Sequence, residues 1–188
     1  RLSNGPRGLS GLAVLGARVA VGISTDTEPY EIAAFENGAF RRLSHHNDSL
    51  MAVLDLGTAE TLDSKSKDGT RVGSMLYLPP DHRPGVKYPL ALHIHGGPFG
   101  QDGHDFDFMR RTFAARGFAV LAPNYRGSSG YGKTWRDALE GNPGFTELAD
   151  IARVHDWVVR TGIADPQRLI LSGQSWGGYL TLLGLGCQ

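Results

Sequence analysis

The first part of the chain alternates between hydrophobic and polar residues over short distances. Four segments have the length and the alternation of half-buried strands: RVAVGIS, YEIAAF, AFRRL and LMAVLDL. Asn37 and Gly38 separate two of them, and this pair readily takes the positive φ values of a tight hairpin turn. In the apolar stretch GLAVLGARVAVGI, Arg18 interrupts the run, which favours two strands over a signal segment. We predict antiparallel strands and no helix of normal length over residues 1–57.

From about residue 58 longer apolar runs appear. An Asp68-Gly69 turn joins two strands, and three nearly continuous apolar runs are typical of strands covered on both faces: KYPLALHIH, FAVLA and RLILS. Between the first two runs, Phe106, Met109 and Phe113 lie at helical spacing, which predicts a helix with these residues on its hydrophobic face, ended by Gly117.

A longer helix is predicted from about Thr146 to Arg160, with one hydrophobic face formed by Leu148, Ile151, Val154 and Val158. Strands that alternate with helices indicate an α/β fold with a parallel sheet.

Composition narrows the class of protein. The 188 residues are 40% hydrophobic and 20% charged, which fits a globular domain plus part of another. Nineteen basic residues balance nineteen acidic ones, so neither nucleic acid nor an anionic membrane is an expected partner. The single cysteine, Cys187, excludes an internal disulfide. The chain starts at Arg1 and stops inside a predicted helix, so we treat it as a piece of a longer protein.

The stretch LILSGQSWGGYL contains a candidate nucleophile. Ser175 follows a buried strand and precedes a helix that begins near Trp176, where the backbone amides and helix dipole favour an oxyanion. Trp176 N–H is one oxyanion donor by position. Gly173, Gly177 and Gly178 allow the sharp turn to pack closely against neighbouring backbone. The alternative is a glycine-rich turn in which Ser175 only caps the helix.

A second oxyanion donor is expected from the stretch HIHGGPFG, because Gly96 and Gly97 let backbone amides approach a substrate oxygen closely. The segments HGGPFGQDG, PNYRGSSGYG and GQSWGGYL, in this order and spacing, resemble the catalytic domain of the prolyl oligopeptidase family of serine peptidases, in particular its acylaminoacyl-peptidase branch. The resemblance covers about residues 58–188. It implies an α/β-hydrolase fold, truncated after the nucleophile helix and preceded by antiparallel β strands from a β-propeller at residues 1–57.

The resemblance also implies roles for individual residues. Ser175 corresponds to the family's nucleophile, and Trp176 and Gly97, or its neighbour Gly96, to its oxyanion donors. Residues expected to shape the wall of the site are His95, Tyr125 and Arg126. In this fold the triad Asp and His follow the serine, yet no residue after Ser175 is Asp, Glu or His. We therefore expect the base and acid beyond Gln188, an inactive isolated chain and an active full-length parent.

Three other functions remain open at this stage. A carboxylesterase would use the same turn and loop, and a truncated homologue would act as a binding module without catalysis. A metal-dependent hydrolase would use His93, His95, His104 and Asp105, although hydrogen-bonded strand histidines explain the same pattern. The leading hypothesis needs no metal or cofactor. It predicts a short peptide as substrate and a cytoplasmic location, and it leaves the oligomeric state open, a homo-oligomer included.

Overall fold

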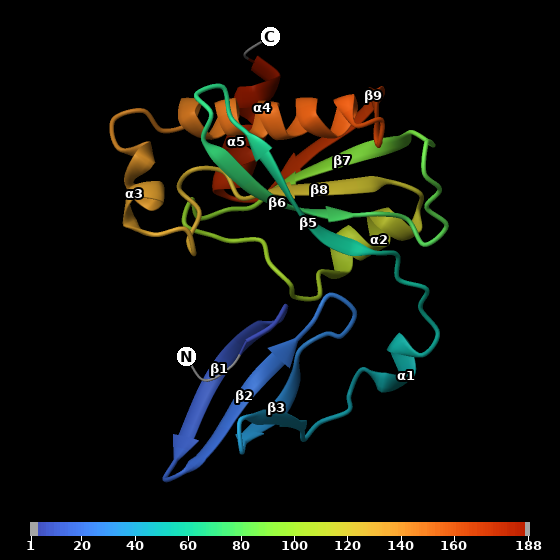
Figure 1. Cartoon of the computed structure of the whole chain (residues 1–188), viewed down its shortest axis with the longest axis vertical. Coiled ribbons are helices and arrows are strands. Elements are labelled where there is room, and N and C mark those ends of the chain that lie inside the picture. Colours follow the sequence, from blue (N-terminus) through green and yellow to red (C-terminus); the bar gives the residue numbers. More distant parts are fainter. Residues whose placement is uncertain (1–3, 187–188) are drawn as a thin grey trace. The chain divides into compact units, whose positions relative to one another are not determined.

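The computed structural model describes residues 4–186 (Figure 1), so Cys187 lies outside the described residues. The chain divides into two compact units. The first contains the chain up to Leu56 together with Gly103–Phe108, and the second contains Gly57–Asp102 and the chain from Met109 onward. Each unit has its own sheet.

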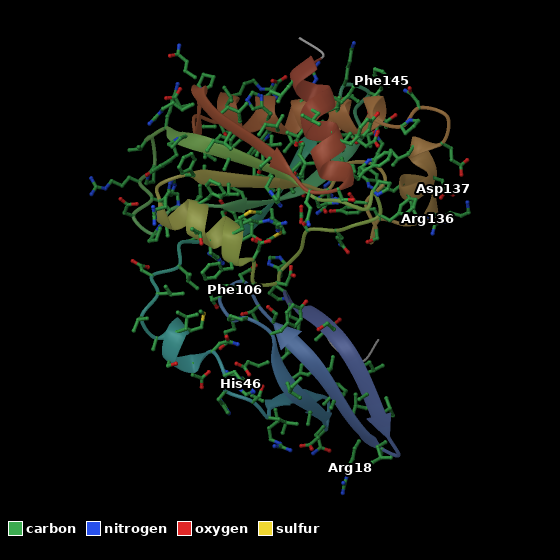
Figure 2. All side chains as sticks on the ribbon, turned by 180° about the vertical axis from the view of Figure 1, so that it is seen from behind. Arg18, His46, Phe106, Arg136, Asp137 and Phe145 are labelled. Atoms are coloured by element: carbon green, nitrogen blue, oxygen red, sulfur yellow. The ribbon has the colours of Figure 1, made fainter. Side chains whose placement is uncertain are left out.

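The first unit is a four-stranded antiparallel sheet in the order β1-β2-β3-β4. Its strands are β1 (Gly8–Leu15), β2 (Arg18–Ser24), β3 (Glu31–Glu36) and β4 (Ala39–Arg42). The predicted hairpin between β3 and β4 is confirmed, with Asn37 at φ 50° and Gly38 at φ 79°. Figure 2 labels Arg18, which begins β2 directly after the β1–β2 turn.

The strand predicted at LMAVLDL is wrong. Its first residues belong to the short helix α1 (Asp48–Met51), and the following residues form no strand. The physical reason is a pair of hydrogen bonds just before the helix. The buried carboxylate of Glu31 accepts them from Asn47 N and Nδ2, and each is 2.9 Å long. The chain is thereby held in a turn where the alternating pattern favoured a strand. His45 and His46 also lie outside any strand, and both are exposed. Figure 2 labels His46.

The second unit contains a five-stranded mixed sheet in the order β5-β6-β8-β7-β9. Its strands are β5 (Ala59–Lys65), β6 (Arg71–Tyr77), β7 (Tyr88–Ile94), β8 (Ala119–Pro123) and β9 (Ala164–Gly173). β7 pairs in parallel with both β8 and β9, as the three apolar runs predicted. β5 and β6 form the predicted antiparallel hairpin, with Gly69 at φ 85° in its turn.

Helices cover both faces of this sheet, α4 and α5 one face and α2 the other (Figure 1). The helices are α2 (Phe108–Ala115), α3 (Lys133–Arg136), η1 (Asp137–Leu139, a 3₁₀ turn), α4 (Phe145–Arg160) and α5 (Trp176–Gly186). Successive residues of β7 alternate between the two cores: Leu90 and Leu92 pack with Ile151 of α4, and Ala91 packs with Ala114 of α2.

The face predicted for α2 is wrong in part. Met109 is 43% exposed, whereas Arg110 and Arg111 are buried. Arg110 pairs with the buried carboxylate of Asp102, and Arg111 donates to the carbonyl O of Gly57. Phe106 precedes the helix, and its backbone N–H donates to Ser24 Oγ within the first unit at 2.9 Å. The buried face of α2 therefore carries paired arginines, whereas hydrophobic spacing alone had placed Met109 and Phe106 on that face.

Candidate active site

Ser175 lies in a sharp turn between the end of β9 and the start of α5, and it is exposed. Its φ is 56°, a left-handed conformation that residues other than glycine rarely adopt. Strain of about 1–3 kcal/mol at such a residue persists only where the surrounding structure enforces it. This geometry holds the hydroxyl at the carboxyl end of a parallel strand, where α/β folds place their reactive groups.

Two glycines make this turn possible by removing side chains from crowded positions. A Cβ added to Gly177 would lie 2.0 Å from the carbonyl O of Ile94, and one added to Gly173 would lie 2.4 Å from the carbonyl O of Gly177. At Gly178 the added Cβ would meet Gly173 O at an ordinary 3.4 Å. The close packing expected of the turn therefore depends on Gly173 and Gly177, and Gly178 contributes no comparable constraint.

The geometry also weighs against Ser175 acting as a simple helix cap. A capping serine accepts a hydrogen bond from an amide in the first turn of its helix and has extended backbone geometry. Here Gly177 N–H donates to the carbonyl O of Gln174 at 3.0 Å, and Ser175 Oγ forms no hydrogen bond with residues 4–186. Its hydroxyl is therefore available for chemistry rather than committed to the helix.

The HGGP loop directly follows β7 and lies against the serine turn. A Cβ added to Gly96 would be 2.9 Å from Gln174 O and 3.3 Å from the Cβ of Ser175. Gly97 has a φ of 130°, and Gly100 N–H closes the loop onto Gly96 O at 3.2 Å. Trp176 is the first residue of α5, so its N–H has no partner within the helix. The structure thus brings Gly96 to the serine turn, and Trp176 follows Ser175 directly in the chain.

His95 and Tyr125, both expected in the site wall, are buried against each other. Their rings stack with centroids 4.4 Å apart, and the Tyr125 hydroxyl donates to His95 O at 2.8 Å. Nε2 of His95 lies 2.8 Å from Ser128 Oγ. Burial, followed by the charges of Glu147 and Asp102, raises the pKa of Tyr125, so its phenol stays protonated and acts as a donor. This pair therefore supports the HGGP loop from within.

Arg126, the third residue expected in the wall, is held in an ion-pair network. Its guanidinium donates to Asp150 at 2.7 Å and to Asp68 at 2.6 Å, and Asp150 also accepts from Ser66 at 2.6 Å. Hydrogen bonding to Asp150 raises the pKa of Arg126. These contacts join the YRG turn to α4 and to the β5–β6 turn. Arg126 therefore has a structural role.

Sequence reasoning missed Glu147, a buried carboxylate that bonds to the side chain of Trp176. Glu147 is fully buried in the first turn of α4, where Oε2 accepts from Gly144 N–H at 2.7 Å. Its Oε1 accepts from the indole Nε1–H of Trp176 at 3.1 Å. A glutamate in the first helical turn was the available signal, since such residues often bond back to the start of the helix.

Trp176 also lines a cavity of about 220 Å³. The other lining residues are Pro98, Phe99, Arg136, Asp137, Leu139, Glu140 and Pro143. Figure 2 labels Arg136 and Asp137, which pair with each other at 3.1 Å. Drug-sized ligands occupy about 300–1,000 Å³, so this cavity suits a single side chain. A larger cavity, about 530 Å³, lies within the first unit and is lined by no candidate catalytic residue.

The histidines of the metal hypothesis have other contacts. His93 Nδ1 lies 3.2 Å from Ser172 Oγ, and His104 Nδ1 lies 2.7 Å from Asp26 Oδ2 within the first unit. Across the part of the chain that the structure describes, His, Cys, Asp and Glu form no group of three or more suited to a metal ion. No helix formed by residues 4–186 combines the length and apolar character needed to cross a bilayer.

A strained, exposed serine between a parallel strand and a helix defines the class of α/β hydrolases. The comparisons with known proteins specify the family: residues 104–188 match the model of the prolyl oligopeptidase family. The chain belongs to this family, whose members are serine peptidases, and it combines antiparallel β-propeller strands with an α/β-hydrolase fold.

Individual relatives agree with this assignment. The chain is 33% identical to "Uncharacterized peptidase YuxL" of Bacillus subtilis over 75% of its length, and 34% identical to "Dipeptidyl aminopeptidase BIII" of Pseudoxanthomonas mexicana over 64%. It spans only 22% and 18% of these two proteins. An acylaminoacyl peptidase solved in complex with Z-Gly-Gly-Phe-chloromethyl ketone is 25% identical, with a TM-score of 0.89 over 98% of this chain and 30% of that one.

Proposed function

We propose that this chain carries the nucleophile of a serine peptidase that cleaves short peptides through an acyl-enzyme on Ser175. The strained and exposed conformation of Ser175 beside Gly96 is the observation that carries the proposal. Family membership supports amide hydrolysis as the reaction, and the 220 Å³ cavity beside Trp176 offers space for one substrate side chain.

In the proposed reaction, Ser175 Oγ attacks the scissile carbonyl carbon and its proton passes to a histidine base. The negative charge on the carbonyl oxygen is stabilised by the N–H groups of Trp176 and Gly97, at the positive end of the α5 dipole. The base then protonates the leaving amine, and water hydrolyses the acyl-enzyme. We propose that the triad His and Asp follow Gln188 in the sequence of the parent protein. We also propose that the parent is a cytoplasmic enzyme.

The experiment compares hydrolysis by the parent protein, by the 188 residues alone and by two serine variants. Peptide anilides and the matching esters are the substrates. We expect amide hydrolysis by the parent, none by the isolated chain, and loss of at least about 10⁴-fold in kcat for Ser175→Ala. Ser49→Ala, at an exposed serine of α1, is the matched control and should keep full activity.

The outcomes separate the remaining functions. Ester hydrolysis without amide hydrolysis would favour the carboxylesterase. No hydrolysis of either substrate by the parent would favour a non-catalytic binding module. Equal activity of Ser175→Ala and Ser49→Ala would overturn the proposal itself.

A further inference from the structure

Glu147 has no role in the chemistry proposed above, yet it is a fully buried carboxylate with both oxygens engaged. One oxygen accepts from Gly144 N–H, and the other accepts from the indole of Trp176. Burying a carboxylate costs free energy unless it is well hydrogen-bonded, so the buried position of Glu147 depends on these two bonds. Together they link the first turn of α4 to the first residue of α5.

The backbone beside this link is closely packed. A Cβ added to Gly144 would lie 2.7 Å from the Tyr179 hydroxyl and 2.8 Å from Cδ2 of Leu183. The start of α4 therefore packs directly on α5. The Trp176 ring lies 5.1 Å from the Tyr179 ring, centroid to centroid, so α5 also holds it from its own side.

We propose that Glu147 is a positioning residue: it holds the Trp176 indole in place as a wall of the 220 Å³ cavity and thereby sets which substrate side chain the cavity accepts. The inference rests on the proposed function. Phe99, Leu139 and Pro143 add apolar surface to the same cavity. Arg136 and Asp137, which pair with each other, and Glu140 form the charged part of the lining. On this proposal, the apolar part accepts an aromatic or large aliphatic side chain next to the scissile carbonyl.

A double-mutant cycle in the parent protein tests this role, with Glu147→Leu and Trp176→Phe measured singly and together. Leucine keeps much of the volume and removes both acceptors, whereas phenylalanine keeps the backbone N–H and removes only the indole donor. The assay compares two peptide anilides that carry Phe or Ala next to the scissile bond. Asp150→Asn is the matched control, because Asp150 is equally buried in α4 and bonds to Arg126 instead.

Glu147→Leu should raise KM for the Phe substrate about tenfold, the ratio expected from losing the charged hydrogen bond to the indole. It should change kcat for the Phe substrate, and KM and kcat for the Ala substrate, less than about twofold. In the Trp176→Phe background, Glu147→Leu should change the Phe-to-Ala preference less than about twofold. Asp150→Asn should lower stability and leave the preference unchanged. Equal shifts in both backgrounds, or the same preference change in Asp150→Asn, would overturn the positioning role.

A second measurement separates this inference from the proposed function and covers a variant that fails to fold. The indole N–H resonance of Trp176, identified by its absence in Trp176→Phe, should exchange slowly with solvent in the unmodified protein. Rapid exchange there would contradict the Glu147 bond, even in an active peptidase. Slow exchange in a parent that hydrolyses no peptide would support the hydrogen bond between Glu147 and Trp176. The same result would overturn the specificity role together with the proposed function.

Discussion

Gly177 and Gly178, adjacent residues at the start of α5, are expected to respond oppositely to replacement by alanine. Alanine is favoured over glycine inside a helix by about 1 kcal/mol, and this gain applies at both positions. At Gly177 the new Cβ would meet Ile94 O at 2.0 Å, and this backbone atom cannot move aside easily because its strand, β7, is paired on both sides by β8 and β9. At Gly178 the nearest atom is 3.4 Å away, an ordinary contact.

The magnitudes follow from these two effects. Overpacking costs about 1–3 kcal/mol and sometimes more, so we take the upper end for a clash with backbone. After subtracting the helix gain, Gly177→Ala should lower the free energy of unfolding by about 2 kcal/mol, while Gly178→Ala should raise it by up to about 1 kcal/mol. With a urea slope near 2 kcal/mol/M, the midpoint should fall by about 1 M and rise by up to about 0.5 M, respectively.

Tryptophan fluorescence during urea unfolding measures this difference in one unit of the protein. The three tryptophans are Trp135, Trp157 and Trp176, and all lie in the second unit. The signal therefore reports on the hydrolase-fold unit alone. Equal midpoint shifts for the two variants, in the same direction, would refute the close packing of Gly177 on Ile94.

Two further predictions concern the first unit. The Ser44 hydroxyl, followed by Asn47, lowers the pKa of Glu31 from 4.5 to about 2, so this carboxylate contributes stability above pH 4.5 that is lost as the pH falls toward 2. Amide exchange in β3 should show that loss, and Glu31→Gln should reduce the pH dependence. Gly38→Ala should destabilise the β3–β4 hairpin by about 1 kcal/mol because Gly38 has a φ of 79°, whereas Asn37→Gly should be nearly neutral by the same exchange measurement.

The sequence predicted the parts of the fold that depend on local pattern. The strands β7 and β8, the helix α4 and the hairpin at Asn37-Gly38 follow from runs, periods and turn residues within a few positions. The serine turn was also predictable, because its glycines lie within three residues of Ser175 in the chain.

The parts that depend on distant polar partners were not predictable. Arg110 is buried because Asp102 pairs with it, which no hydrophobic period reveals. Glu147 and Asp150 appeared as ordinary polar positions of an amphipathic helix, but their partners are Trp176 and Arg126, more than a helix length away in sequence. The same holds at LMAVLDL, where Glu31 holds the preceding turn.

Covalent labelling with a fluorophosphonate tests the central claim most directly, since the reagent reacts with an activated serine and marks its position. In the parent protein, peptide mapping by mass spectrometry should find a single adduct on the peptide that contains Ser175, and Ser175→Ala should abolish it. An adduct on another serine such as Ser172, or an unlabelled Ser175 in a parent that actively hydrolyses peptides, would contradict the assignment.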